Sequence, residues 1–394
     1  MPRAQLPQAP LAVVITSGMA YALYFGAIGA WSPYWPVYFT HLGVDLAAIG
    51  LLAAIPAAVQ IFASPSWGLL ADRLGDVRPS LVAAAIICVG AALLMASGPA
   101  TPWLFPAVAL LALGGSAWPP LMDARTVSAL GAQRDRYGQA RGIGSAGFIV
   151  CSVVVGVLVT AHGPRVLFAA YVPLVAIAGL WVAGLFGRAG VRQRVAGVGP
   201  LGALRLLRDR SMALMFAGSV LVWAACNGAS AFFSLRLVAQ GGDATIVGVG
   251  WAMNAIVEIP FMLLFRPLAR RTGVPALIAT GAAVLAIRNL GWALAGNDLA
   301  TVGVALLSGV GFSLFLVGVT GWLADRVPAS LRATAQALFL GTAYAIGTIT
   351  GSLGAGWLAN SVSLDAMFYV ATVVAAVGAL TIWAAVGRPS PRQA

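Results

Sequence analysis

The feature that most constrains this chain is a series of long apolar stretches along its whole length. A helix needs about 20 apolar residues to cross the hydrocarbon core of a membrane, and no backbone group can be left unpaired there. The sequence contains twelve stretches of sufficient length, and none shows the alternation of a strand. We therefore predict an all-α integral membrane protein with 12 transmembrane helices, at residues 11–39, 47–70, 79–98, 103–128, 138–161, 165–187, 211–239, 244–268, 275–296, 299–323, 331–359 and 363–387.

Composition excludes a soluble protein and orients the chain in the membrane. Only 9% of the residues are charged, against about 25% in soluble domains. All 23 basic residues are arginine, and twenty of them lie in or beside the terminal segments and loops of one side. Arg165 and Arg236 fall on the other side, and Arg288 lies inside a span. The positive-inside rule makes the arginine-rich side cytoplasmic, so both termini are predicted there, in a bacterial inner membrane. The net charge of +12 therefore reflects orientation and indicates no nucleic-acid partner.

Part of the sequence is present twice. Residues 21–75 and 219–273 align at a constant offset of 198 without gaps, with 14 of 55 positions identical. Chance identity among small apolar residues is the alternative, but turn residues and an arginine match at the segment ends: Gly43/Gly241, Asp45/Asp243, Arg73/Arg271 and Gly75/Gly273. The duplication predicts two pseudo-symmetric six-helix bundles, 1–187 and 211–394, joined by a basic cytoplasmic linker at 188–210. Such paired bundles are typical of solute transporters.

Two carboxylates, Asp123 and Glu258, lie inside predicted spans, where an ionised group costs at least ~2.5–3.5 kcal/mol. Asp123 and Arg141 each lie nine residues from the centre of one predicted hairpin, which puts both ~13 Å above its turn at 1.5 Å per residue. Glu258 and Arg288 each lie fifteen residues from Gly273, near which the next predicted pair of spans turns. At 1.5 Å per residue this puts both ~22 Å above that turn. Each half therefore offers an acid and an arginine at matched depth.

These pairs have two interpretations. In the functional one, Asp123 and Glu258 couple transport to protons, because a carboxylate removed from water binds a proton more readily. Arg141 and Arg288 then bind the substrate, because a guanidinium can hold a carboxylate through two parallel hydrogen bonds. In the alternative, each pair is only a structural salt bridge between neighbouring helices.

The segment Gly68-Leu-Leu-Ala-Asp72-Arg73-Leu-Gly75 resembles the signature of the major facilitator superfamily. The resemblance implies that these residues form a conformational latch, in which the aspartate caps a nearby helix and pairs with basic residues. The family pattern continues with basic residues directly after the glycine, whereas Asp76 follows here and a basic residue returns only at Arg78.

A second resemblance points to the branch that contains phenylpropionate permeases and lactose permease. Its motifs are Pro120-Leu-Met-Asp123-Ala, Tyr137-Gly138-Gln-Ala-Arg141-Gly-Ile-Gly144-Ser145-Ala-Gly147-Phe148 and Pro328-Ala-Ser-Leu-Arg332-Ala-Thr-Ala-Gln336, and Glu258 and Arg288 also match. In that branch the acid and arginine at the positions of Asp123 and Arg141 form part of the substrate site. The resemblance also implies a path lined by Tyr24, Trp118, Asn227 and Phe312, unless these side chains only fill helix contacts. The resemblance aligns Ser308 and Phe315 with the positions at which lactose permease carries histidines used for proton coupling.

The resemblance implies a secondary active transporter that moves a small organic solute, with an aromatic carboxylate favoured, by alternating access coupled to protons. A sugar or nucleoside symporter, a drug exporter and an uncoupled facilitator remain alternatives. No enzyme is expected, because the spans contain no histidine and no HExxH or phosphate-binding pattern occurs. We expect no cofactor and no metal. The expected partners are the solute, protons and membrane lipids, and the protein is expected to be a monomer.

Overall fold

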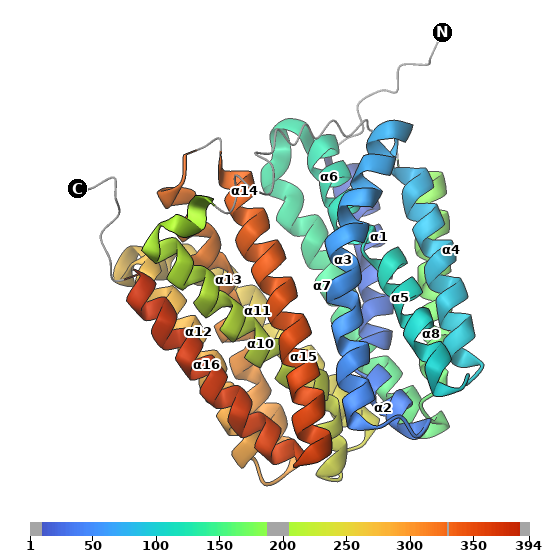
Figure 1. The fold of residues 1–394 in the computed structure, drawn as a ribbon. Helices are drawn as coiled ribbons and strands as arrows, with labels where there is room; N and C mark the ends of the chain where they lie inside the picture. Colours follow the sequence, from blue (N-terminus) through green and yellow to red (C-terminus); the bar gives the residue numbers. More distant parts are fainter. Residues whose placement is uncertain (1–9, 187–204, 329–330, 387–394) are drawn as a thin grey trace. The chain divides into compact units, whose positions relative to one another are not determined.

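The computed structural model describes residues 10–186, 205–328 and 331–386, and all regular elements in these ranges are helices (Figure 1). The α-helices are α1 (Pro10–Trp31), α2 (Trp35–His41), α3 (Leu46–Leu74), α4 (Val77–Ala96), α5 (Thr101–Gly115), α6 (Trp118–Leu130), α7 (Tyr137–His162), α8 (Val166–Leu185), α10 (Arg210–Ala239), α11 (Ala244–Thr272), α12 (Val274–Leu294), α13 (Asp298–Arg326), α14 (Arg332–Gln336), α15 (Tyr344–Ser361) and α16 (Leu364–Val386). Two 3₁₀ helices, η1 (Gly131–Arg136) and η2 (Arg205–Arg208), and a π-helix, η4 (Ala337–Ala343), complete the described elements.

Among the described residues, eleven helical stretches are long and apolar enough to cross a membrane. The longest, Thr101–His162, has 62 residues and contains two of the predicted spans. It folds back on itself at η1, between α6 and α7. The predicted fold of 12 transmembrane helices is therefore confirmed. Most of the linker predicted at 188–210 lies outside the described residues.

Two predicted spans are not single regular helices. The first is interrupted between α1 and α2, where Pro33 lies in a turn at Ser32–Tyr34. Proline lacks the N–H of a helical hydrogen bond and disfavours a helical conformation in the residue before it. The stretch predicted at 331–359 passes from α14 through the π-helical turns of η4 into α15. Such π-helical segments are rare.

The duplicated residues form the same turn in both copies. Gly43 and Gly241 have φ of 80° and 90°, values that glycine adopts readily and other residues rarely do. Asp45 and Asp243 each accept a hydrogen bond from the backbone N–H three residues further on, at 2.7 and 2.9 Å. Each aspartate thus caps the helix that follows, α3 or α11. The matched residues are the ones that end one helix and start the next.

The chain forms two compact units. Unit 1 comprises Met1–Tyr34 and Phe62–Gln193, and unit 2 comprises Trp35–Ile61 and Arg194–Ala394. The division passes through α3. In unit 1, α1 packs on α7 and α8, and α4 packs on α5 and α8. In unit 2, α10 lies along α15 and α16, while α13 packs on α11 and α12 (Figure 1). The core of unit 2 contains large aromatic side chains, among them Trp223, Phe315 and Phe339.

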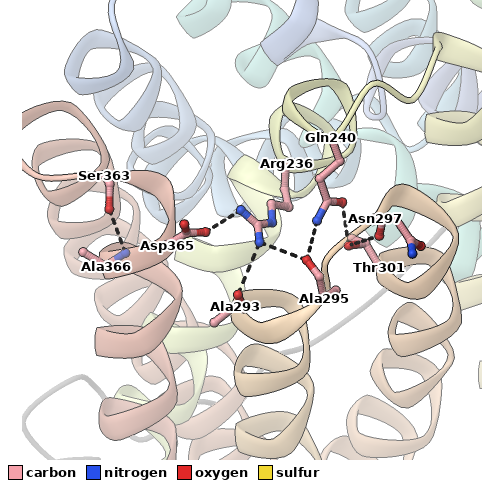
Figure 2. Close-up of polar contacts among 9 residues, drawn as sticks. All are labelled: Arg236, Gln240, Ala293, Ala295, Asn297, Thr301, Ser363, Asp365 and Ala366. Atoms are coloured by element: carbon pink, nitrogen blue, oxygen red, sulfur yellow. Dashed lines mark hydrogen bonds and ion pairs between the residues drawn. The ribbon is translucent and has the colours of Figure 1, made fainter.

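A polar cluster connects four elements at one end of unit 2. Arg236 on α10 pairs with Asp365 on α16 and donates to the backbone oxygens of Ala293 and Ala295, at 3.3 and 3.2 Å (Figure 2). Gln240 also donates to the Ala295 oxygen, at 2.6 Å, and accepts from Thr301 of α13 at 2.7 Å. The carbonyls released where α12 ends are thus paired by side chains of α10. This arrangement holds one end of α10 against its neighbours.

Candidate functional site

The structure brings Asp123 of α6 and Arg141 of α7 together in unit 1. Arg141 Nη1 lies 3.9 Å from Asp123 Oδ1. Tyr21 of α1 donates its hydroxyl proton to the same carboxylate oxygen at 2.6 Å. Because η1 is a compact turn, the residues on either side of it emerge at similar heights on α6 and α7. The depth matching predicted from the sequence therefore corresponds to a real contact.

The close approach of α1 and α7 positions Arg141. A Cβ added at Gly147 would lie 2.5 Å from the Ala22 oxygen of α1, so only glycine permits this crossing. The guanidinium carbon of Arg141 lies 4.2 Å from the centre of the Phe25 ring and 5.3 Å from that of Tyr21. These distances allow cation–π attraction to both rings. The glycines of the α7 motif therefore bring the arginine against two aromatic faces.

The ion pair of Asp123 and Arg141 is loose. The 3.9 Å separation is too long for a hydrogen bond, and the two side chains are 38% and 37% exposed. Ion pairs of this kind contribute about 0–1 kcal/mol. By contrast, Arg78 Nε and Nη2 donate to Asp76 Oδ2 at 2.8 and 2.7 Å. Arg141 Nη1 is buried and has no hydrogen-bond partner among the described residues. One donor nitrogen of the cation is therefore unused among the described residues.

Two of the predicted path residues, Tyr24 and Trp118, lie in the same part of unit 1. Their rings stack with centres 5.1 Å apart, and Tyr24 also meets Phe25 edge-on at 5.2 Å. Tyr24 donates to the Gly115 oxygen at 3.1 Å. Trp118 is fully buried, and its Nε1 has no partner within the described part of the chain. A chain of aromatic contacts thus runs from Arg141 through Phe25 and Tyr24 to Trp118.

Arg288 of α12 is buried in unit 2, with 3% exposure. Its Nε and Nη2 donate to Asn289 Oδ1 at 3.1 and 2.6 Å, and Nη2 also donates to the Cys226 oxygen at 3.2 Å. Nη1 donates to the hydroxyls of Ser230 and Ser308, at 3.3 and 3.4 Å. The oxygens that accept these bonds are all uncharged. Arg288 therefore places a positive charge inside the bundle, and neutral oxygens accept its hydrogen bonds.

Glu258 lies in the middle of α11 and is half-buried. Its backbone oxygen accepts from Ser313 of α13 at 2.9 Å. A Cβ added at Gly309 of α13 would lie 2.7 Å from the Glu258 nitrogen, so the two backbones touch here. This contact fixes the height of Glu258 in the bundle. Its proposed pairing with Arg288 stays a prediction.

The other two predicted path residues contact their own unit. Asn227 donates through Nδ2 to Thr348 Oγ1 at 2.6 Å, which joins α10 to α15. Phe312 meets Trp223 edge-on, with ring centres 5.8 Å apart. Tyr344 packs on the same tryptophan at 5.1 Å. These contacts are compatible with helix packing as well as with a path.

The predicted latch residues lie at the end of α3. Gly68, Asp72 and Arg73 belong to the helix, and Gly75 ends it with a φ of 64°. Asp72 and Arg73 are exposed. The carboxylate that caps α4 is Asp76, which accepts from the Arg78 N–H at 3.1 Å. The latch role of the signature stays a prediction.

Sequence reasoning missed several residues of these clusters. Tyr21 donates a hydrogen bond directly to Asp123, a contact that the sequence pattern does not predict. Asn289 and Ser230 contact Arg288 and were not expected to do so. For Ser230 the sequence contains a signal, because Ser230 aligns with an identical residue, Ser32, in the duplicated segments. Ser308, one of the positions that replace a histidine, also contacts Arg288.

Comparison with known proteins identifies the class of protein to which this fold belongs. The chain is a multi-pass membrane transporter of small solutes. The family model described as "MFS_1 like family" matches residues 15–370, so the chain belongs to this family. The predicted membership of the major facilitator superfamily is confirmed.

Two curated relatives are similar over nearly their whole length. One is the maltose permease of Geobacillus stearothermophilus, 26% identical over 373 residues, with 92% of each chain covered. Another is a probable 3-phenylpropionic acid transporter of Escherichia coli (strain K12), 26% identical over 376 residues, covering 90% of this chain and 97% of the relative. A crystal structure of the nucleoside transporter NupG has a TM-score of 0.84 at 18% identity, covering 96% of this chain and all of that one. That likeness supports the fold alone.

Proposed function

We propose that the protein is a secondary active transporter of a small organic carboxylate, with an aromatic acid as the favoured class, and that proton binding at Asp123 drives it. The observation that carries the proposal is the state of Arg141. This cation lies over two aromatic rings, beside a weakly held carboxylate, with Nη1 unused among the described residues. A structural salt bridge would be expected at hydrogen-bond distance.

The substrate carboxylate would bind Arg141 through two parallel N–H donors. An aromatic substituent would find apolar contact on Phe25 and Tyr24, whereas Trp118 is fully buried and supports the Tyr24 ring. Because Asp123 contributes little to holding Arg141, a second carboxylate can replace it at small energetic cost. Solute recognition in unit 1 thus needs no large rearrangement of side chains.

Coupling follows from competition for the arginine. An ionised Asp123 attracts Arg141 and repels an incoming carboxylate, whereas a protonated Asp123 does neither. Proton binding therefore favours substrate binding, and by linkage substrate binding favours protonation. Positive coupling of this sign corresponds to symport. If occupancy of both sites favours one of two alternating states, a proton gradient can drive accumulation. We assign Glu258 and Arg288 of unit 2 the corresponding roles of second proton site and second substrate contact.

The relatives support an organic solute and define the alternative. One is described as a probable 3-phenylpropionic acid transporter and another as a maltose permease. A neutral sugar or nucleoside is the second candidate, because the hydrogen bonds of Arg288 all go to uncharged groups that suit polar solutes. The arginine distribution further supports a bacterial inner-membrane location with both termini in the cytoplasm. We propose that the transporter works as a monomer.

The test is accumulation in proteoliposomes under an inward proton gradient, with radiolabelled 3-phenylpropionate, maltose and uridine as probes. Asp123→Asn should abolish accumulation of the acid above equilibrium while exchange down its gradient persists, and Glu258→Gln should do the same. Asp135→Asn makes the same chemical change at an exposed position in η1 and serves as the control. Wild-type accumulation by D123N and E258Q would remove both from coupling. Accumulation of maltose or uridine but of no acid would favour the second candidate.

A further inference from the structure

Unit 2 contains a small cavity beside Arg288 that the transport proposal does not use. Its volume is about 20 Å³, and it lies among α10, α11, α12 and α13. The polar part of its lining comes from Ser230, Asn254 and Ser308. A cavity of at least about 10–15 Å³ can hold one water molecule if polar partners are present. The cavity is therefore large enough for one oxygen-sized group.

The hydrogen bonds around the cavity are incomplete. Asn254 Oδ1 is buried, and no donor among the described residues reaches it. Ser230 and Ser308 each accept from Arg288 Nη1, at 3.3 and 3.4 Å. A hydroxyl that accepts a hydrogen bond still has its proton to donate. The cavity thus presents one acceptor, Asn254 Oδ1, and two hydroxyl donors, and a buried acceptor left unpaired is unfavourable.

The remaining walls are mainly aromatic, with Gly250 and Ala305 completing the lining. Phe233 and Trp292 stack with ring centres 4.6 Å apart, and Trp251 meets Phe233 edge-on at 6.1 Å. The indole N–H of Trp251 is already used, because it donates to Ser234 Oγ at 3.1 Å. The polar partners of an occupant are therefore the asparagine and the two serines. A few polar groups within aromatic walls are typical of small-molecule sites.

We propose that this cavity is a subsite for a hydroxyl group. The occupant donates its proton to Asn254 Oδ1 and accepts from Ser230 or Ser308. Water supplies the hydroxyl in the empty transporter, and a hydroxyl of the transported solute displaces that water. The inference rests on the proposed transport function and narrows the substrate class to hydroxylated solutes.

The binding test compares 3-phenylpropionate with 3-(4-hydroxyphenyl)propionate and its 2- and 3-hydroxy isomers, by calorimetry on the purified full-length protein. Asn254→Leu keeps the shape of the side chain and removes the acceptor. Loss of one neutral hydrogen bond should weaken the best hydroxylated probe about three- to tenfold and leave 3-phenylpropionate unchanged. Ser219→Ala is the control, because it removes a buried hydroxyl of α10 in the same unit that does not line the cavity. Equal weakening of both kinds of probe, or of neither, would overturn the solute assignment.

A high-resolution density map of the unliganded protein tests the cavity independently of any substrate. We expect one ordered water within hydrogen-bonding distance of Asn254 Oδ1 in the wild type and none in N254L. An empty cavity would overturn the inference even if carboxylate transport is correct. If the wild type binds none of the acids, the proposed function fails, while the map still shows whether the cavity holds a water. If the water stays in place when a hydroxylated probe is bound, the solute does not use the subsite.

Discussion

Replacing Arg141 with lysine separates the charge of this residue from its geometry. Lysine keeps the positive charge and can still lie over Phe25, where the guanidinium carbon is now 4.2 Å from the ring centre. The loss is the second of two parallel hydrogen bonds to a substrate carboxylate. A hydrogen bond to a charged group contributes about 1.5–3 kcal/mol. Because the Arg141 side chain is 37% exposed and water competes, the lower end applies, about 1.5 kcal/mol or roughly a tenfold weaker Kd.

Calorimetric titration of purified R141K with 3-phenylpropionate measures this change, and 3-phenylpropanamide serves as an uncharged ligand of the same shape. Only the acid should weaken. Arg326→Lys is the matched protein control, because the Arg326 guanidinium lies 4.4 Å from the Trp322 ring centre in unit 2. Unchanged binding of the acid to R141K would refute the carboxylate role. A tenfold loss for the amide as well would show that the substitution only disturbs the aromatic packing.

Two further substitutions test the site in unit 1 and the helix packing within unit 2. Tyr21→Phe removes the hydroxyl that positions the Asp123 carboxylate at 2.6 Å, so gradient-driven accumulation in proteoliposomes should fall while exchange down the substrate gradient persists; wild-type accumulation by Y21F would contradict this role. Gly351→Ala should destabilise unit 2, because the added Cβ would lie 2.0 Å from a carbonyl oxygen of α10. Overpacking of this kind costs about 1–3 kcal/mol, which should appear as a lower thermal unfolding temperature. Gly354 lies on the same helix, and a Cβ added there would meet nothing within 4 Å, so Gly354→Ala should unfold like the wild type.

Local features of this chain could be predicted from its sequence where they depend on neighbouring residues. The twelve crossings follow from apolar length, and the duplicated turns follow from Gly43, Asp45 and their counterparts, which end one helix and cap the next. The contact of Asp123 with Arg141 was predictable because only a short turn separates their helices.

Other features depend on helix rotation and packing, which sequence spacing does not determine. The acceptors of Arg288 come from α10, α12 and α13, so they meet only when three helices have packed. The cap of α4 shows a similar limit. The sequence offers both Asp72 and Asp76 near the helix boundary, and the residue at which α4 begins makes Asp76 the cap. The hydrogen bond from Tyr21 to Asp123 depends on how α1 faces α6.

The most direct test of the central claim is a density map of the transporter with 3-phenylpropionate bound. The account predicts that the substrate carboxylate lies within hydrogen-bonding distance of the Arg141 guanidinium, with its ring against Phe25 and Tyr24. It also predicts that Asp123 has moved away from the arginine while keeping its bond to Tyr21. A substrate bound elsewhere, with Asp123 and Arg141 still 3.9 Å apart as they are now, would contradict the account.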